Sequence, residues 1–414
     1  MDSLDRTSAI LVGLFFAFVC VFNNVEGASI VSRLIGLSVL LWFLVYMSFK
    51  QRLKSNPMVM CYALFVGWAV LTYPLSKYPG LAWDNMYTQI QLFFITLAVT
   101  QIIKSKRQLL LVINIFLLSA YVAIAMNYAE FIHSIVYNMT ASRPLRFSGT
   151  IGNANGVALY GMLVSFSVII GFSLSRKSLV QMSHLFFSLL IGSGFIIQSG
   201  SRKGMLGLVI IFFLIGYYIY KANAHIKWLR IILILLPLVL TAFMINFFIN
   251  SPFFSRFEMM ASGNESSMIE RLYLLQTAYN VWTQDTYNFL IGVGYGQFVF
   301  YNRIGFLSHN SISEATVTTG LIGFLMYFSI YISFAKNIFA IKVPKHATTL
   351  QKIQKVVLII ILINYVLFEF SAIIFRSRYM LPYLGLVSVY VLHFRHEIMS
   401  IPQKKGLIST VPTT

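Results

Sequence analysis

Long runs of hydrophobic residues, separated by short polar and basic segments, occupy this chain from end to end. The hydrocarbon core of a bilayer is roughly 30 Å thick, which about 20 apolar residues cross as an α-helix. Runs approaching this length predict spans at residues 8–22, 29–48, 57–75, 88–103, 108–126, 154–174, 179–198, 204–220, 228–250, 315–335, 354–374 and 378–396. The pattern therefore predicts an all-α, polytopic membrane protein with about twelve transmembrane helices.

Two of the polar segments between spans are too long to be simple turns. They cover residues 127–153 and, between spans nine and ten, residues 251–314. Loops longer than about 12–15 residues are usually functional or disordered. The larger segment also carries apolar residues at helical spacing, namely Met268, Leu272, Leu275 and Tyr279. This spacing predicts amphipathic helices that lie on the membrane surface.

The basic residues indicate which side of the membrane each segment occupies. With the N-terminus placed in the cytoplasm, most of the 31 Lys and Arg fall in short segments on that side. Cytoplasmic loops are enriched in these residues. We therefore expect both termini in the cytoplasm and 251–314 outside it, with 1–400 as one integral membrane domain and 401–414 as a disordered cytoplasmic tail. The first hydrophobic run lacks an A-x-A cleavage site and is expected to remain as a span.

Composition narrows the class further. Hydrophobic residues make up 58% of the chain and charged residues only 10%, against about 25% charged in soluble proteins. The net charge of +19 would attract nucleic acid if it formed a continuous face. It comes instead in twos and threes between apolar runs, so we expect no nucleic-acid partner. Cys20 and Cys61 lie in apolar runs and the histidines are scattered, so we expect no metal site and no cofactor.

The basic residues predicted to lie on the outer side are not explained by topology. They include Arg143, Arg146, Arg202, Lys203, Arg256, Arg271, Arg303, Arg376 and Arg378. Arginine forms bidentate bonds to phosphate and keeps its charge, so the set is suited to a shared anionic ligand such as a pyrophosphate. Each arginine taken singly could equally extend to a lipid phosphate.

A few residues in these outer segments could carry chemistry. Arg202 lies in a turn of small residues, SGSRKG at 199–204, where backbone amides can approach an anion. Arg271 follows Glu270 on a predicted helix, and His309 precedes Asn310 just before span ten. A histidine can accept a proton from a sugar hydroxyl or orient it, although a structural role at the interface is the alternative.

Two further features bear on rival functions. Glu369 is the carboxylate placed most clearly inside a span, and it lies seven residues from Arg376. An ion pair between the two explains it as well as a proton relay in a transporter does. The glycine-rich stretch GVGYG at 292–296 follows no predicted strand, so we interpret it as a turn of the large segment and not as a nucleotide-binding loop.

The order of these motifs resembles the O-antigen ligase and O-antigen polymerase family of bacterial membrane glycosyltransferases. The resemblance rests on FSGTIGNANG at 147–156, SGSRKG at 199–204, Glu270-Arg271 followed by GVGYG at 292–296, and Ser308-His309-Asn310 leading to GLIG at 320–323. It covers residues 145–330. Family members often read Gly-Asn-Pro-Asn where this chain has Gly152-Asn153-Ala154-Asn155, a change that relaxes the turn and keeps both amides.

The resemblance implies a donor glycan on undecaprenyl pyrophosphate, transferred to an acceptor hydroxyl at the outer face of the inner membrane without a metal. By position, Arg202 and Arg271 would hold the pyrophosphate and His309 would orient or deprotonate the acceptor. We expect the remaining substrate contacts from Arg146, Asn153, Asn155, Lys203 and Asn310.

The leading hypothesis is thus a repeat-unit polymerase for an O-antigen or capsule-type polysaccharide, whose acceptor is a second lipid-linked glycan. A ligase, whose acceptor is a lipid A core sugar, is a close alternative that no residue excludes. A flippase for lipid-linked oligosaccharides belongs to another class, and it predicts charged residues along a path through the whole bilayer. A noncatalytic scaffold predicts that Arg202, Arg271 and His309 affect stability alone.

Overall fold

The computed structural model describes residues 3–22, 25, 29–50, 53–140, 145–175, 178–222, 266–344, 347–370 and 372–399. Every regular element in these ranges is a helix, which confirms the predicted all-α class. The predicted span at 228–250, the tail at 401–414, and Arg143 and Arg256 lie outside the described residues.

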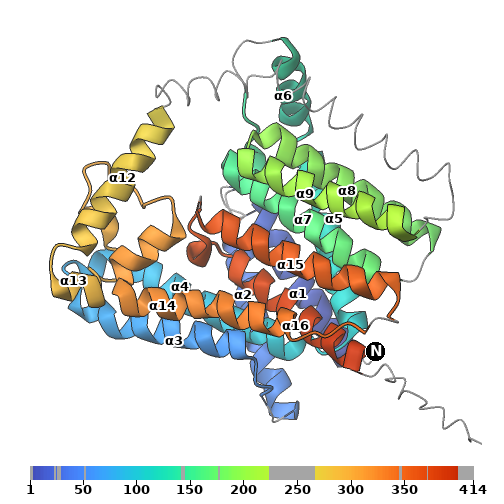
Figure 1. The fold of residues 1–414 in the computed structure, drawn as a ribbon, viewed down its shortest axis with the longest axis horizontal. Coiled ribbons are helices and arrows are strands. Elements are labelled where there is room, and N and C mark those ends of the chain that lie inside the picture. The colour runs from blue at the N-terminus through green and yellow to red at the C-terminus, as the bar shows by residue number, and fades with distance from the viewer. Residues whose placement is uncertain are drawn as a thin grey trace, which may run out of the picture.

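The long helices follow the hydrophobic runs closely (Figure 1). They are α1 (Ser3–Phe22), α2 (Ser29–Lys50), α3 (Pro57–Thr72), α4 (Pro79–Ile102), α5 (Lys106–Met126), α7 (Ala154–Leu174), α8 (Leu179–Ser199), α9 (Arg202–Ala222), α14 (Ser311–Phe339), α15 (Thr349–Glu369) and α16 (Met380–Met399). Among the described helices, eight are long and apolar enough to cross a membrane. The chain is a multi-pass membrane protein, and the total of twelve spans stays a prediction.

Helix α7 lies at the centre of one half of the molecule. It packs against α8 and α5, while α1 packs against α5 and α2. Small residues bring α7 and α8 together, because a Cβ on Gly161 would lie 2.5 Å from the Gly192 carbonyl oxygen. Glycines allow this close approach of membrane helices. The tight crossing places the end of α8 beside the beginning of α7.

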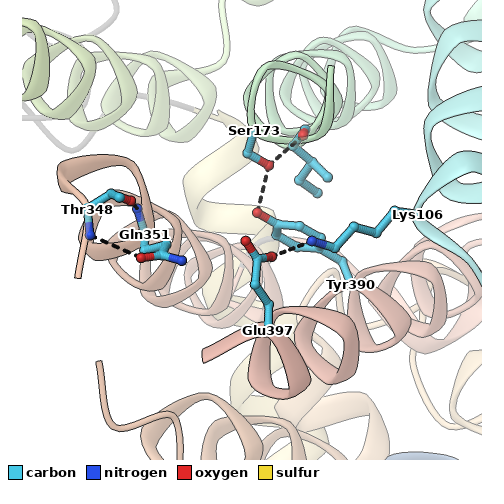
Figure 2. Close-up of polar contacts among 7 residues, drawn as sticks. Lys106, Ser173, Thr348, Gln351, Tyr390 and Glu397 are labelled. Carbon is cyan, nitrogen blue, oxygen red and sulfur yellow. Dashed lines mark hydrogen bonds and ion pairs between the residues drawn. The ribbon is translucent and has the colours of Figure 1, made fainter. Parts of the chain in front are cut away.

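The other half is built on α3, α4, α14 and α16. Helix α14 packs against α3, and α16 packs against α4 (Figure 1). At one end of the bundle, the first turns of α5 and α15 meet the last turns of α7 and α16 (Figure 2). There Ser173 and Tyr390 share a 2.7 Å hydrogen bond, and Lys106 pairs with Glu397. These helix ends adjoin segments that the charge pattern assigns to the cytoplasm, so the fold brings those segments to one side.

Helix α14 is broken at Gly320, where the sequence predicted a continuous span. Gly320 has φ 66° and ψ −175°, a conformation open essentially to glycine alone. At the break, carbonyl oxygens that would accept hydrogen bonds within a continuous helix accept them from other segments instead. Val293 N–H donates to Val317 O at 2.9 Å, Gly294 N–H to Thr318 O at 3.0 Å, and Trp68 Nε1 to Thr319 O at 2.9 Å. A short half-helix, 311–319, therefore stands apart from the longer part of α14.

The large polar segment contains two more helices, as predicted. They are α12 (Ser266–Trp282) and the short α13 (Thr286–Leu290). Both contact α14 and lie at the left of the view, away from the labelled N-terminus (Figure 1). The segment at 127–153 also holds a helix, α6 (Tyr128–Thr140), at the top of the view.

Candidate functional site

The first part of the site is an arginine cluster, which we define as Arg146, Asn155 and residues 199–203. The chain before α7 runs along the end of α8, with Phe147 N–H donating to Gln198 O at 3.0 Å. This contact brings the Arg146 guanidinium to the SGSRKG turn, where Nε donates to Ser199 O at 3.0 Å. Nη2 donates to Asn155 Oδ1, also at 3.0 Å. Two of the predicted substrate contacts, Arg146 and Asn155, are thus hydrogen-bonded to each other.

The SGSRKG turn joins α8 to α9. Gly200 ends α8 with φ 66°, and its N–H donates to Ile197 O at 3.1 Å. Ser201 Oγ accepts the Gly204 N–H at 3.4 Å, which caps the first turn of α9. Arg202 is the first residue of α9, and Lys203 follows it with a partly exposed side chain. Nothing is described of the Arg202 side chain, so its predicted contact with phosphate stays a prediction.

The turn before α7 is held by two residues that the sequence did not single out. Asn127, between α5 and α6, accepts the Thr150 N–H at 2.8 Å and donates to Thr150 Oγ1 at 3.0 Å. Glu130 of α6 accepts the Gly149 N–H at 3.1 Å. Asn153, predicted to contact substrate, has a local role as well, because its Oδ1 accepts the Gly156 N–H at 2.7 Å and caps α7. No spacing in the sequence predicts the contacts of Asn127 and Glu130, whose partners lie 23 and 19 residues away along the chain.

The second part of the site is the histidine loop, which we define as residues 301–310, together with the first turns of α12. Leu274 and Ala278 of α12 are buried against Val293, Phe298 and Val317. Residues three and seven positions apart share one helical face. Arg271 therefore lies on the same side of α12 as this small core, one turn before it. Arg303 N–H donates to Tyr273 Oη at 3.2 Å and ties the loop to α12.

His309 adopts an unusual backbone conformation. Its φ is 56°, and it is the one non-glycine residue with positive φ in the part of the chain that the structure describes. Such a conformation is strained for a residue with a Cβ. The Ser308 side chain is buried, while the His309 side chain is exposed and its ring lies 6.2 Å from that of Phe306. The strained backbone therefore belongs to the same residue whose imidazole is exposed.

The charges of α12 act on this imidazole. Partial burial by surrounding protein atoms lowers the pKa of His309 most. The positive charge of Arg271 lowers this pKa further, whereas the negative charge of Glu270 raises it. The hydrogen bond from Arg303 to Tyr273 ties the loop of His309 to the helix of Arg271, two residues 38 positions apart that the sequence assigned to one site. A lowered pKa keeps the ring neutral at neutral pH, and the neutral ring is the form that can accept a proton.

Asn310 has a clear structural role. Its side-chain oxygen accepts the Ile312 and Ser313 N–H groups at 2.9 and 3.4 Å and caps α14. The Ser308 hydroxyl donates to the Asn310 carbonyl at 2.8 Å. These bonds connect the histidine loop rigidly to the half-helix 311–319.

The glycine-rich stretch 292–296 forms a turn, as predicted. Gly292, Gly294 and Gly296 all have positive φ. A Cβ on Gly292 would lie 2.5 Å from Gly320 N. The N–H groups of Val293 and Gly294 donate to carbonyl oxygens at the break in α14, so they are not available to another acceptor. This turn supports the half-helix that carries the histidine loop.

The proposed ion pair between Glu369 and Arg376 is wrong. Within the described ranges, Glu369 accepts hydrogen bonds from Tyr327 at 2.5 Å and from Tyr331. Arg376 donates to Asn85 of α4. The backbone explains the difference, because α15 ends at Glu369 and Arg376 belongs to a separate 3-10 turn at Ile374–Arg376, so the two do not share a helical face.

Fold and site together define a multi-pass helical membrane protein with an arginine cluster and a histidine loop in predicted outer segments. Residues 185–328 match the O-antigen ligase family. The predicted resemblance is therefore confirmed over this stretch, which is similar to the O-antigen ligase family of membrane enzymes in polysaccharide biosynthesis. The match includes Arg202, Arg271 and His309, whereas Arg146, Asn153 and Asn155 precede it. A search of curated proteins found no match.

Proposed function

We propose that the protein is a polysaccharide repeat-unit polymerase of the bacterial inner membrane. Its donor is a glycan on undecaprenyl pyrophosphate and its acceptor is a hydroxyl group of a second lipid-linked glycan, joined at the outer face. The proposal rests on the match to the O-antigen ligase family and, above all, on the exposed His309 at a positive φ, in a loop that a hydrogen bond ties to the helix carrying Arg271.

In the transfer step, the acceptor oxygen attacks the anomeric carbon of the donor sugar. The bond between that carbon and the pyrophosphate oxygen breaks, and undecaprenyl pyrophosphate leaves. His309 takes the hydroxyl proton, while Arg202 and Arg271 stabilise the charge that builds on the leaving group. Fixed cationic donors are suited to this task because they need no reorganisation when the charge appears. Arg146, oriented by Asn155, adds a third cation.

Complementation of a deletion strain tests this function. Wild type is compared with Arg202→Ala, Arg271→Ala and His309→Ala, each with its membrane level measured, and surface glycan is separated by length. Arg303→Ala, an exposed arginine of the same loop, and His133→Ala, an exposed histidine of α6, serve as matched controls.

Variants that reach the membrane but yield single-unit glycan support a polymerase, with both controls at wild-type length. Long chains that accumulate on the undecaprenyl carrier would assign the ligase reaction instead. Wild-type glycan from all three site variants would refute the catalytic roles and favour a scaffold or a flippase.

A further inference from the structure

The strained turn at His309 needs contacts on both sides to persist. Backbone conformations of this kind survive where surrounding structure over-determines them. On the C-terminal side, Asn310 caps α14 with its side chain. On the N-terminal side, the contact comes from a residue to which the proposed reaction gives no part.

That residue is Glu314, in the first turn of the half-helix. Its side chain is 1% exposed. Its Oε2 accepts the Ser308 N–H at 3.0 Å, and the Ser308 residue is itself 3% exposed. The backbone N–H of Ser308, the residue before His309, is therefore held by a buried carboxylate. Hydrogen bonds to a charged acceptor are stronger than neutral ones.

Burying this carboxylate is costly, and the structure provides an opposing charge. Arg376 lies close enough to Glu314 for its positive charge to favour the carboxylate. Both Glu314 Oε1 and Arg376 Nη1 are buried without a hydrogen-bond partner in the described part of the chain. Arg376 is anchored in turn to Asn85 of α4. The histidine loop is thus tied through one carboxylate to α14, with the charge of Arg376 nearby.

We propose that Glu314 is a positioning residue for the transfer reaction: its carboxylate holds the Ser308 amide and so fixes the backbone that presents the His309 imidazole to the acceptor hydroxyl. This inference rests on the proposed function. Glu314 makes no contact with substrate in this scheme, so its loss should slow the chemical step and leave donor binding intact.

Two substitutions of similar volume separate the hydrogen bond from packing. Glu314→Gln keeps an oxygen that can accept the Ser308 N–H, whereas Glu314→Met fills the space without an acceptor. Glu314→Ala repeats the comparison if the Met protein does not accumulate. Glu369→Gln, at another buried carboxylate, is the matched control.

The full-length proteins are purified, placed in nanodiscs and assayed with a lipid-linked repeat unit. We expect Glu314→Met to lower kcat about 10- to 100-fold, the range for an unpaired buried donor, with the donor KM unchanged. Glu314→Gln should lower kcat by no more than about fivefold, since it retains an acceptor, although a neutral one. Amide hydrogen exchange of the peptide containing Ser308 should speed up in the Met variant alone.

Wild-type kcat and exchange in Glu314→Met would overturn the proposal, and so would equal losses in the Gln and Met variants. The two hypotheses fail separately. If His309→Ala retains full activity, the proposed function is wrong, whereas the exchange measurement still reports whether Glu314 holds the loop.

Discussion

The break in α14 makes a demanding prediction about Gly320. A Cβ at this position would lie 2.2 Å from Leu290 O, and the φ of 66° with ψ −175° is strained for any other residue. The strain costs about 1–3 kcal/mol, and the clash with backbone adds about 1–3 kcal/mol of overpacking. Gly320→Ala should therefore destabilise the protein by about 2–6 kcal/mol and displace the half-helix beneath the histidine loop.

Two other glycines separate the cost of the positive φ from the cost of the steric clash. Gly305 has φ 71° but open space around its Cβ position, so Gly305→Ala should cost only about 1–2 kcal/mol of strain. Gly67, inside α3, has neither a positive φ nor a neighbour within 4 Å. Gly67→Ala should be neutral or stabilise the helix by up to about 1 kcal/mol.

Thermal unfolding of the purified variants in detergent gives their Tm values. The length of the glycan made in cells then shows whether each variant still polymerises. The expected order of Tm is Gly67→Ala at or above wild type, then Gly305→Ala, then Gly320→Ala, which should also lose polymerisation. If Gly320→Ala unfolds no earlier than Gly305→Ala and still makes long chains, the break in α14 does not support the site as argued.

Three further outcomes follow from the site. Because Glu270 raises the pKa of His309 and transfer needs the neutral ring, Glu270→Gln should move the acid limb of the rate profile to lower pH, and an unmoved or raised limb would contradict this. Asn155→Ala removes one bond that orients Arg146, so the donor KM should rise about fivefold with Tm unchanged; an unchanged KM would argue against Arg146 as a substrate contact. Lys106→Ala breaks a half-exposed ion pair, so Tm should fall by no more than about 1 °C, and a larger fall would show that this helix junction is more important than its exposure implies.

Hydrophobic runs were enough to predict the helices but not all of their ends. Span four was expected at 88–103, whereas α4 begins at Pro79. Proline is well suited to the first turn of a helix because it has no N–H to satisfy. The first turns of α4 therefore extend the helix beyond its apolar run, where hydropathy carries no signal.

The break in α14 could not be predicted from periodicity. Residues 315–335 are mostly apolar and carry no charged residue, and Gly320 alone does not end a helix. What ends it is a distant turn, because Val293 and Gly294 take the carbonyls of Val317 and Thr318. The sequence shows the glycines of both segments but not that they meet.

The candidate site was predicted by residue type, and two of its predicted substrate contacts also have a structural role. Arg271 and His309 were placed in one site, which stays a prediction; in the structure the Arg303–Tyr273 hydrogen bond ties the loop of His309 to the helix of Arg271. Asn153 and Asn310 were expected to contact substrate, and both are helix caps. An Asn before an apolar run is typical of an N-cap, so that signal was available. Nothing in the sequence indicated that Asn127 and Glu130 support the turn at 149–150.

Reconstitution tests the central claim most directly. The purified protein in liposomes receives one undecaprenyl-pyrophosphate-linked repeat unit, and mass spectrometry follows lipid-linked glycans and released undecaprenyl pyrophosphate. Wild type should form glycans of two or more units with one undecaprenyl pyrophosphate released per bond, whereas folded His309→Ala should form none. Intact donor with folded wild-type protein, or equal elongation by His309→Ala, would contradict the account.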